Sequence, residues 1–151
     1  MERLLAMLAC ALIMAASGAG VSAATPEQEK QFVDTYKKAY DAKDAKTLNA
    51  MLYTKGADAQ ALEFYKMMIT SEMGGKITSI QLLDLTAEDK ARAAKTQSPD
   101  GRPMKLVLPA TKKLVTKSET KDKNGSSSSS SEVFVGESDG RLYILLPAAA
   151  K

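Results

Sequence analysis

The sequence of 151 residues lacks histidine and tryptophan and has a single cysteine, Cys10. Without an imidazole, the commonest general base and the commonest metal ligand are both missing. Without a second thiol, an intrachain disulfide is excluded, so stability has to come from a hydrophobic core. The chain has neither a glycine-rich phosphate loop nor a nucleophile elbow. These absences favour a non-catalytic protein without metal or cofactor.

Residues 1–24 have the layout of a secretory signal peptide. A charged start, an apolar run of about 13 residues over 4–16 and small residues before Ala24 predict cleavage after Ala24. A retained membrane anchor is the alternative, but a spanning helix needs about 20 apolar residues. Lipidation of Cys10 is a second alternative, weakened by the short apolar stretch before it. We expect residues 25–151 to be one secreted or periplasmic domain without a stable membrane span.

The charges are nearly balanced, with 21 basic and 18 acidic residues and a formal net charge of +3. Lysines are interleaved with acids instead of being gathered into one block, which argues against a nucleic-acid partner. Scattered acids such as Glu88, Asp89 and Asp122 are interpreted as solvated surface residues.

The first half of the chain predicts three helices. A threonine cap, a proline at the first helical position and a glutamine that completes a capping box begin a helix over 25–42. Asp44 is expected to cap a helix over 44–56, and Asp58 one over 58–74 that a pair of glycines ends.

The second half predicts strands. The first covers 77–85 and is expected to be buried on both faces at its end. A short helix over 86–95 and a Ser-Pro-Asp-Gly turn at 98–101 lead to a long strand over 104–121, broken or bulged at Pro109.

The C-terminal part predicts two hairpins. Residues 124–131, an Asn-Gly pair and six serines, are interpreted as a flexible hairpin connection, with a disordered linker as the alternative. Asp-Gly at 139–140 predicts a tight turn between strands over 133–135 and 142–146, and Pro147 is expected to end the last strand. The order of elements predicts an α+β fold in which N-terminal helices pack on one face of a curved antiparallel sheet of about four strands.

Residues 32–52, FVDTYKKAYDAKDAKTLNAML, resemble the opening of the nuclear transport factor 2-like superfamily, which includes ketosteroid isomerases and polyketide cyclases. There an aromatic first helix ends in an xAxDxxxL turn, and the resemblance implies a cone of helices wrapped by a bent sheet. Many members place a hairpin between the second and third helices, and 52–58 leaves no room for one. A cystatin-like layout therefore stays open.

The resemblance gives Tyr36 a candidate role, because it precedes Asp44 by eight residues, as does the oxyanion-stabilising tyrosine of the ketosteroid isomerases. Such an enzyme also needs a carboxylate base. The segment that would carry it is the missing hairpin, and Gln60 stands near the expected offset. An isomerase-like or cyclase-like enzyme is therefore an alternative, and a packed core tyrosine is preferred.

Aromatic residues and methionines gather in the helical half and could line a pocket for a small apolar ligand, although core filling is the simpler interpretation. The residues expected to line that pocket are Tyr36, Tyr40, Phe64, Tyr65 and Met68. The main hypothesis is thus an exported, non-catalytic binding or scaffold domain.

A lysine-rich hairpin supports another alternative, a module that binds an envelope protein or an acidic envelope polymer. Its lysines are Lys112, Lys113, Lys117, Lys121 and Lys123. The hairpin is expected to project with both faces in water. Lysines on an exposed strand also prevent edge-to-edge aggregation, which is the preferred interpretation. A homodimer is left open.

Overall fold

The computed structural model describes residues 23–98 and 100–150. The predicted leader therefore lies outside the described residues, apart from its last two positions. The helices are α1 (Pro26–Asp41), α2 (Ala45–Ala50), α3 (Ala59–Glu72) and α4 (Ala87–Ala94). The strands are β1 (Lys76–Asp84), β2 (Met104–Leu106), β3 (Lys112–Asp122), β4 (Gly125–Ser138), β5 (Arg141–Ile144) and β6 (Pro147–Ala149).

Every helix begins at the cap that the sequence predicts. Thr25 and Gln28 form the reciprocal capping box of α1, and Asp44 and Asp58 accept backbone hydrogen bonds at the starts of α2 and α3. These bonds satisfy amide groups that the first helical turn leaves without an internal partner. The prediction for the second helix is wrong at its end, because α2 stops at Ala50 instead of continuing to residue 56.

The early end of α2 follows from a contact with the sheet. Leu52 forms a parallel bridge with Ile144, and the Tyr53 amide donates to the Ile144 carbonyl over 2.9 Å. The Ile144 amide in turn donates to the Met51 carbonyl over 2.8 Å. Backbone groups after α2 therefore bond to the end of β5, and a longer helix would lose these bonds.

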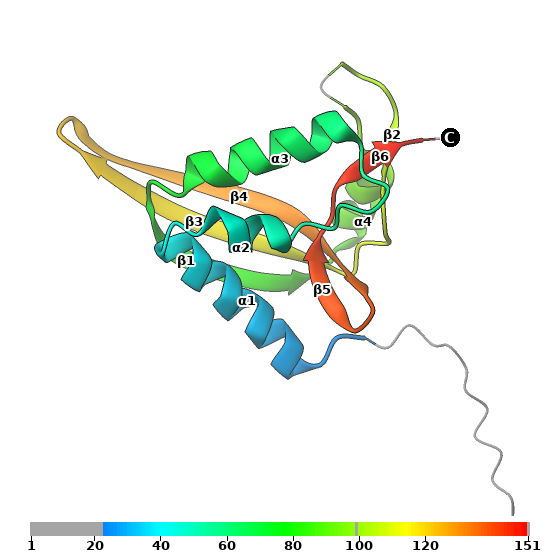
Figure 1. The fold of residues 1–151 in the computed structure, drawn as a ribbon, viewed down its shortest axis with the longest axis horizontal. Helices are drawn as coiled ribbons and strands as arrows, with labels where there is room; N and C mark the ends of the chain where they lie inside the picture. The colour runs from blue at the N-terminus through cyan, green and yellow to red at the C-terminus, as the bar shows by residue number, and fades with distance from the viewer. Residues whose placement is uncertain (1–22, 99, 151) are drawn as a thin grey trace, which may run out of the picture.

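One antiparallel sheet with strand order β1-β3-β4-β5 confirms the predicted α+β fold. Figure 1 shows α1, α2 and α3 on one face of this long, curved sheet, with α4 behind it. The turn between β4 and β5 is also as predicted, since Asp139 and Gly140 both have positive φ angles, 51° and 71°. None of the described helices is both long and apolar enough to cross a bilayer.

The interpretation of the six serines as a connection is wrong. Ser126 to Ser131 belong to β4 and pair with β3, from Lys121 opposite Ser126 to Thr116 opposite Ser131. The turn itself lies at residues 123–124, and Gly125 begins the strand with a φ of 137°. Pairing with β3 satisfies the serine backbone and overrides the low strand preference of a serine run.

The single long strand predicted over 104–121 is two strands in two different sheets. β2 pairs with β6, whereas β3 lies in the four-stranded sheet, and residues 107–111 with Pro109 connect them. Pro147 begins β6 instead of ending the preceding strand, and it tolerates this place because a first strand residue can lack a donor. The end of β1 is not buried on both faces either, because Leu83 is 39% exposed.

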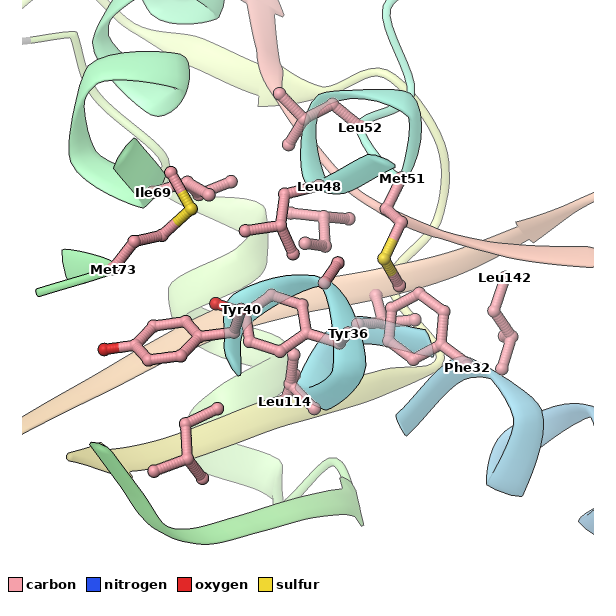
Figure 2. Close-up of a cluster of buried hydrophobic side chains, with 14 of the residues drawn as sticks. Phe32, Tyr36, Tyr40, Leu48, Met51, Leu52, Ile69, Met73, Leu114 and Leu142 are labelled. Carbon is pink, nitrogen blue, oxygen red and sulfur yellow. The ribbon is translucent and has the colours of Figure 1, made fainter. Parts of the chain in front are cut away.

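Side chains from the helices and the sheet fill the interior between them. Figure 2 shows Tyr36 and Tyr40 of α1 lying between Leu48 of α2 and Leu114 of β3, with Phe32 next to Met51 and Leu142. The Tyr36 and Tyr40 rings are stacked with their centroids 6.4 Å apart. Ile69 and Met73 close the core from the α3 side.

Candidate binding groove

The residues expected to line one pocket separate into two groups. Tyr36 and Tyr40 are buried in the core, as the packed-tyrosine interpretation expects. Phe64, which is 47% exposed, and the half-buried Tyr65 lie on α3 and line a groove at the surface. Met68 is half-buried further along α3 and is not among the residues that line this groove.

The groove has a volume of about 710 Å³ and lies between α3, the segment after α4 and the small β2–β6 sheet. Its apolar lining comes from Ala61, Phe64 and Tyr65 of α3, Met104 of β2 and Pro147 of β6. The polar residues around it are Asp58, Gln60, Glu63, Thr96, Gln97, Ser98 and Asp100. An apolar body with polar groups at its margin is the usual character of a small-molecule site.

Hydrogen bonds fix the walls of the groove. The Asp58 amide donates to the Pro147 carbonyl over 3.1 Å, which holds the start of α3 against β6. On the other wall, Arg102 donates from Nε to Asp100 over 2.7 Å and from its guanidinium to the Gln60 side chain over 3.3 Å. The Met104 amide donates to the Thr96 carbonyl over 2.8 Å. The groove is therefore largely formed before any ligand enters.

The two aromatic rings of the groove contact each other. The Phe64 and Tyr65 centroids are 6.1 Å apart with the planes at 75°, an edge-to-face arrangement. Burial raises the pKa of the Tyr65 hydroxyl, so it stays protonated at neutral pH and can donate a hydrogen bond. The groove can hold an apolar or aromatic body.

Tyr36 has an acidic neighbour that the sequence reasoning missed. Burial raises the pKa of the Tyr36 hydroxyl most, the charge of Glu72 raises it further, and a side-chain hydrogen bond with Thr116 opposes them. Burial also raises the pKa of the Glu72 carboxyl, to which the Ser131 hydroxyl donates over 3.3 Å. Gln60, the residue near the expected offset, lies in the groove instead.

One sequence signal marks Glu72. It is an acid in the last turn of α3, where the helix dipole disfavours negative charge. Tyr40 donates its hydroxyl to the Glu72 carbonyl, so the end of α3 is bound to the core at this point. Neither Tyr36 nor Glu72 lines the groove.

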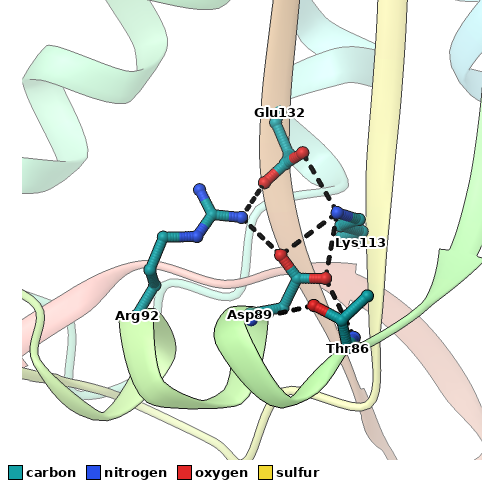
Figure 3. Close-up of polar contacts among 5 residues, drawn as sticks. All are labelled: Thr86, Asp89, Arg92, Lys113 and Glu132. Atoms are coloured by element: carbon teal, nitrogen blue, oxygen red, sulfur yellow. Dashed lines mark hydrogen bonds and ion pairs between the residues drawn. The ribbon is translucent and has the colours of Figure 1, made fainter.

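A second polar cluster joins α4 to the sheet. Figure 3 shows Asp89 at its centre, accepting hydrogen bonds from the Thr86 amide at 2.9 Å, Arg92 at 2.5 Å and Lys113 at 3.1 Å, with Glu132 above them. The Thr86 backbone contact, then Lys113 and Arg92, hold the pKa of the Asp89 carboxyl far below its usual range. The interpretation of Asp89 as solvated is wrong, because only 3% of it is exposed.

The lysines of the predicted hairpin lie in two different environments. Lys112 lies between Asp84 at 2.7 Å and Glu29 at 3.0 Å, and Lys113 is bound by the α4 cluster. These two lysines join β3 to α1, β1 and α4. Lys117 and Lys121, by contrast, are exposed on the hairpin of β3 and β4 that projects from the body in Figure 1.

Within residues 23–98 and 100–150, no group of three or more acidic residues is arranged to hold a metal ion.

No protein-family model matches the sequence, and no curated protein matches it. Among solved structures, two that match cover much of the chain. The helical cell shape determining protein Pgp2 from Campylobacter jejuni is 14% identical with a TM-score of 0.44, over 77% of this chain and 38% of that one. An NTF-2 like protein of unknown function from Shewanella oneidensis MR-1 is 12% identical with a TM-score of 0.42, and the match covers 81% of this chain and 95% of that one.

The chain thus spans well under half the length of the Campylobacter protein. At these identities and TM-scores, neither structure assigns a family. The resemblance to the nuclear transport factor 2-like superfamily stays a prediction.

Proposed function

We propose that this chain is an exported, non-catalytic binding domain that holds a small apolar ligand in the groove beside α3. The groove itself carries the proposal, because its volume of about 710 Å³ lies within the range of about 300–1,000 Å³ typical of ligand sites. Its walls come from segments separated by many residues and are fixed by hydrogen bonds, as a preformed site requires.

An exposed aromatic side chain supports the same location. Phe64, which lines the groove, is 47% exposed, and Met67, one turn further along α3 and outside the groove lining, is 63% exposed. Leaving such side chains in water costs free energy that a bound apolar ligand would recover. Leu83 on β1 is also exposed, at 39%, but does not line the groove, so it provides a control.

Export and family membership belong to the proposal as well. The apolar run and small residues before Ala24 support export. The aromatic helix and turn over residues 32–52, together with helices on one face of a bent sheet, support a place in the nuclear transport factor 2-like superfamily. In that case the cone interior is filled in this protein, and the binding site has moved to the outside of α3.

Fluorescence titration with N-phenylnaphthylamine, a small uncharged apolar dye, tests the groove. We expect saturable binding to the purified protein, and Phe64→Ala should weaken it about tenfold because one wall of the groove is removed. Leu83→Ala, an equally simple truncation at a distant exposed position, should leave the affinity unchanged.

Two results would contradict the proposal. Equal affinities for the two variants would show that the dye binds elsewhere. Loss of binding in Tyr36→Phe but not in Phe64→Ala would place the ligand inside the core beside Glu72, as the isomerase alternative requires.

A further inference from the structure

One edge of β4 has no partner strand in the described part of the chain. β3 pairs with β4 along Gly125 to Val135, and β5 pairs only with Val135 to Ser138 on the opposite edge. Residues 126–132, which we name the serine edge, are therefore bonded on one side only. Ser126 to Ser130 are all exposed.

The direction of the free backbone groups follows from two hydrogen bonds. The Phe134 carbonyl accepts from the Leu145 amide over 2.9 Å on the β5 side, and the Val135 carbonyl accepts from the Thr111 amide over 2.9 Å on the other side. Backbone groups of alternate residues point to opposite edges, and the β3–β4 register is unbroken. The residues whose backbone groups face outward are therefore Ser126, Ser128, Ser130 and Glu132.

The serine edge lacks the usual protection of an edge strand. Natural edges carry lysine, proline or a β-bulge, each of which prevents another strand from pairing. Residues 126–131 are all serine, and no register shift interrupts their pairing with β3. Their small side chains leave the outward N–H and C=O groups open to an approaching strand.

The face of the hairpin away from α1 carries an excess of positive charge. Thr116 and Ser118 are buried on the inner face, so the alternate residues of β3 lie on the outer face. Cross-strand pairing gives the rows of this outer face beside the serines as Ser79–Lys117–Ser130, Lys76–Glu119–Ser128 and Lys121–Ser126. The next row ends in Glu132, whose carboxylate already pairs with Arg92 and Lys113. The three rows beside the serines thus carry three lysines and one glutamate.

We propose that the serine edge binds an extended acidic segment of a partner protein, which adds one strand to the sheet. The added strand would lie about 4.8 Å from β4 and about 10 Å from β3. Lys117 and Lys121 can reach across the small serines to carboxylates on the added strand. A second copy of this chain offers serine against serine and no complementary charge. The hairpin lies far from β2 and β6 in Figure 1, so this surface is separate from the proposed ligand groove.

Two capped heptapeptides test the proposal, one alternating glutamate with valine and threonine and the other with lysine in place of glutamate. In amide NMR spectra of the purified protein, the acidic peptide should shift Ser126, Ser128 and Ser130, and the basic peptide should not. The double variant Lys117→Glu/Lys121→Glu should bind the acidic peptide about tenfold more weakly and gain affinity for the basic one.

A backbone variant separates strand addition from simple charge attraction. Ser128→Pro removes an outward N–H that β3 does not use, so the fold should persist while peptide binding is lost. Ser128→Thr keeps the N–H and should bind as the unchanged protein does. Circular dichroism checks the fold of both.

Three outcomes would overturn the proposal. Lysine-dependent binding that Ser128→Pro leaves intact would show attraction of polyanions in general. A concentration-dependent dimer with the serine-edge amides protected would show pairing with a second copy. Absence of binding by the acidic peptide in a folded protein would show that the edge is not a binding surface.

Discussion

Replacing Leu48 by alanine tests whether the interior between the helices and the sheet is filled. Leu48 is 0% exposed and lies on α2 among Tyr40, Leu52 and Ile69 (Figure 2). The companion variant is Phe64→Ala on α3, where the side chain is 47% exposed. A filled core and a surface groove predict very different costs for these two truncations.

The cost at Leu48 follows from the carbons removed. Leucine to alanine deletes three carbons, and burial is worth about 0.8 kcal/mol for each, which gives about 2.4 kcal/mol. The unfilled cavity raises the loss to about 3–4 kcal/mol. At Phe64 the side chain is only half buried, so its truncation loses about half of the free energy that full burial would provide. The higher helix propensity of alanine offsets part of this loss. We expect a loss of about 0.5 kcal/mol.

Urea unfolding followed by far-UV circular dichroism measures both values, with an unchanged slope against urea as the condition for comparison. In thermal melts, Leu48→Ala should lower the midpoint by about 10–15 °C. A loss below about 1 kcal/mol at Leu48 would refute the reasoning, because it would show a loose or hollow interior. A loss at Phe64 as large as that at Leu48 would refute the placement of Phe64 at the surface.

The remaining predictions concern a close backbone contact, an acid-sensitive cluster and the leader. Gly136→Ala should lower the free energy of unfolding by about 1–3 kcal/mol in urea titrations, because the new Cβ would lie 2.8 Å from the Pro109 carbonyl oxygen. Gly74→Ala is the control, since no atom lies within 4 Å of the new Cβ, and it should change stability by less than about 0.5 kcal/mol. Asp89 stabilises the fold above its unfolded pKa of about 3.9, and this contribution is lost as the pH falls through the lowered folded pKa. At neutral pH, Asp89→Asn should therefore be less stable than the unchanged protein. On acidification below about pH 4, the variant should lose less stability than the unchanged protein does, and thermal melts across a pH series measure both. If the chain is exported as proposed, the intact mass of the protein recovered from its own host should give Thr25 as the first residue, and an uncleaved N-terminus would contradict export.

Local signals predicted the starts of the helices and the β4–β5 turn. A cap such as Asp58 acts on amide groups within its own first turn, and the Asp139–Gly140 turn requires only that two residues adopt positive φ. Sequence spacing is sufficient for both, because no distant part of the chain takes part.

Distant pairing decided what the sequence could not predict. The serines of β4 have little strand preference, and only β3 opposite them makes the segment extended. Likewise Pro147 begins a strand because β2, more than forty residues earlier, pairs with it. Long-range contacts of this kind leave no mark in a local window.

The candidate site was predicted in part for the same reason. Phe64 and Tyr65 follow from the gathering of aromatic residues in the helical half, but Met104 and Pro147 of the opposite wall are brought there by the β2–β6 pairing. Asp89 looked like a surface acid because its partners, above all Lys113, come from another element.

Methionine methyl NMR tests the location of the binding site most directly. All three methionines are buried, but Met104 lines the groove, whereas Met51 and Met73 belong to the core between the helices and the sheet. On saturation with N-phenylnaphthylamine, the Met104 methyl resonance should shift and those of Met51 and Met73 should stay in place. Shifts of Met51 and Met73 with Met104 unchanged would place the ligand inside the core and contradict the account.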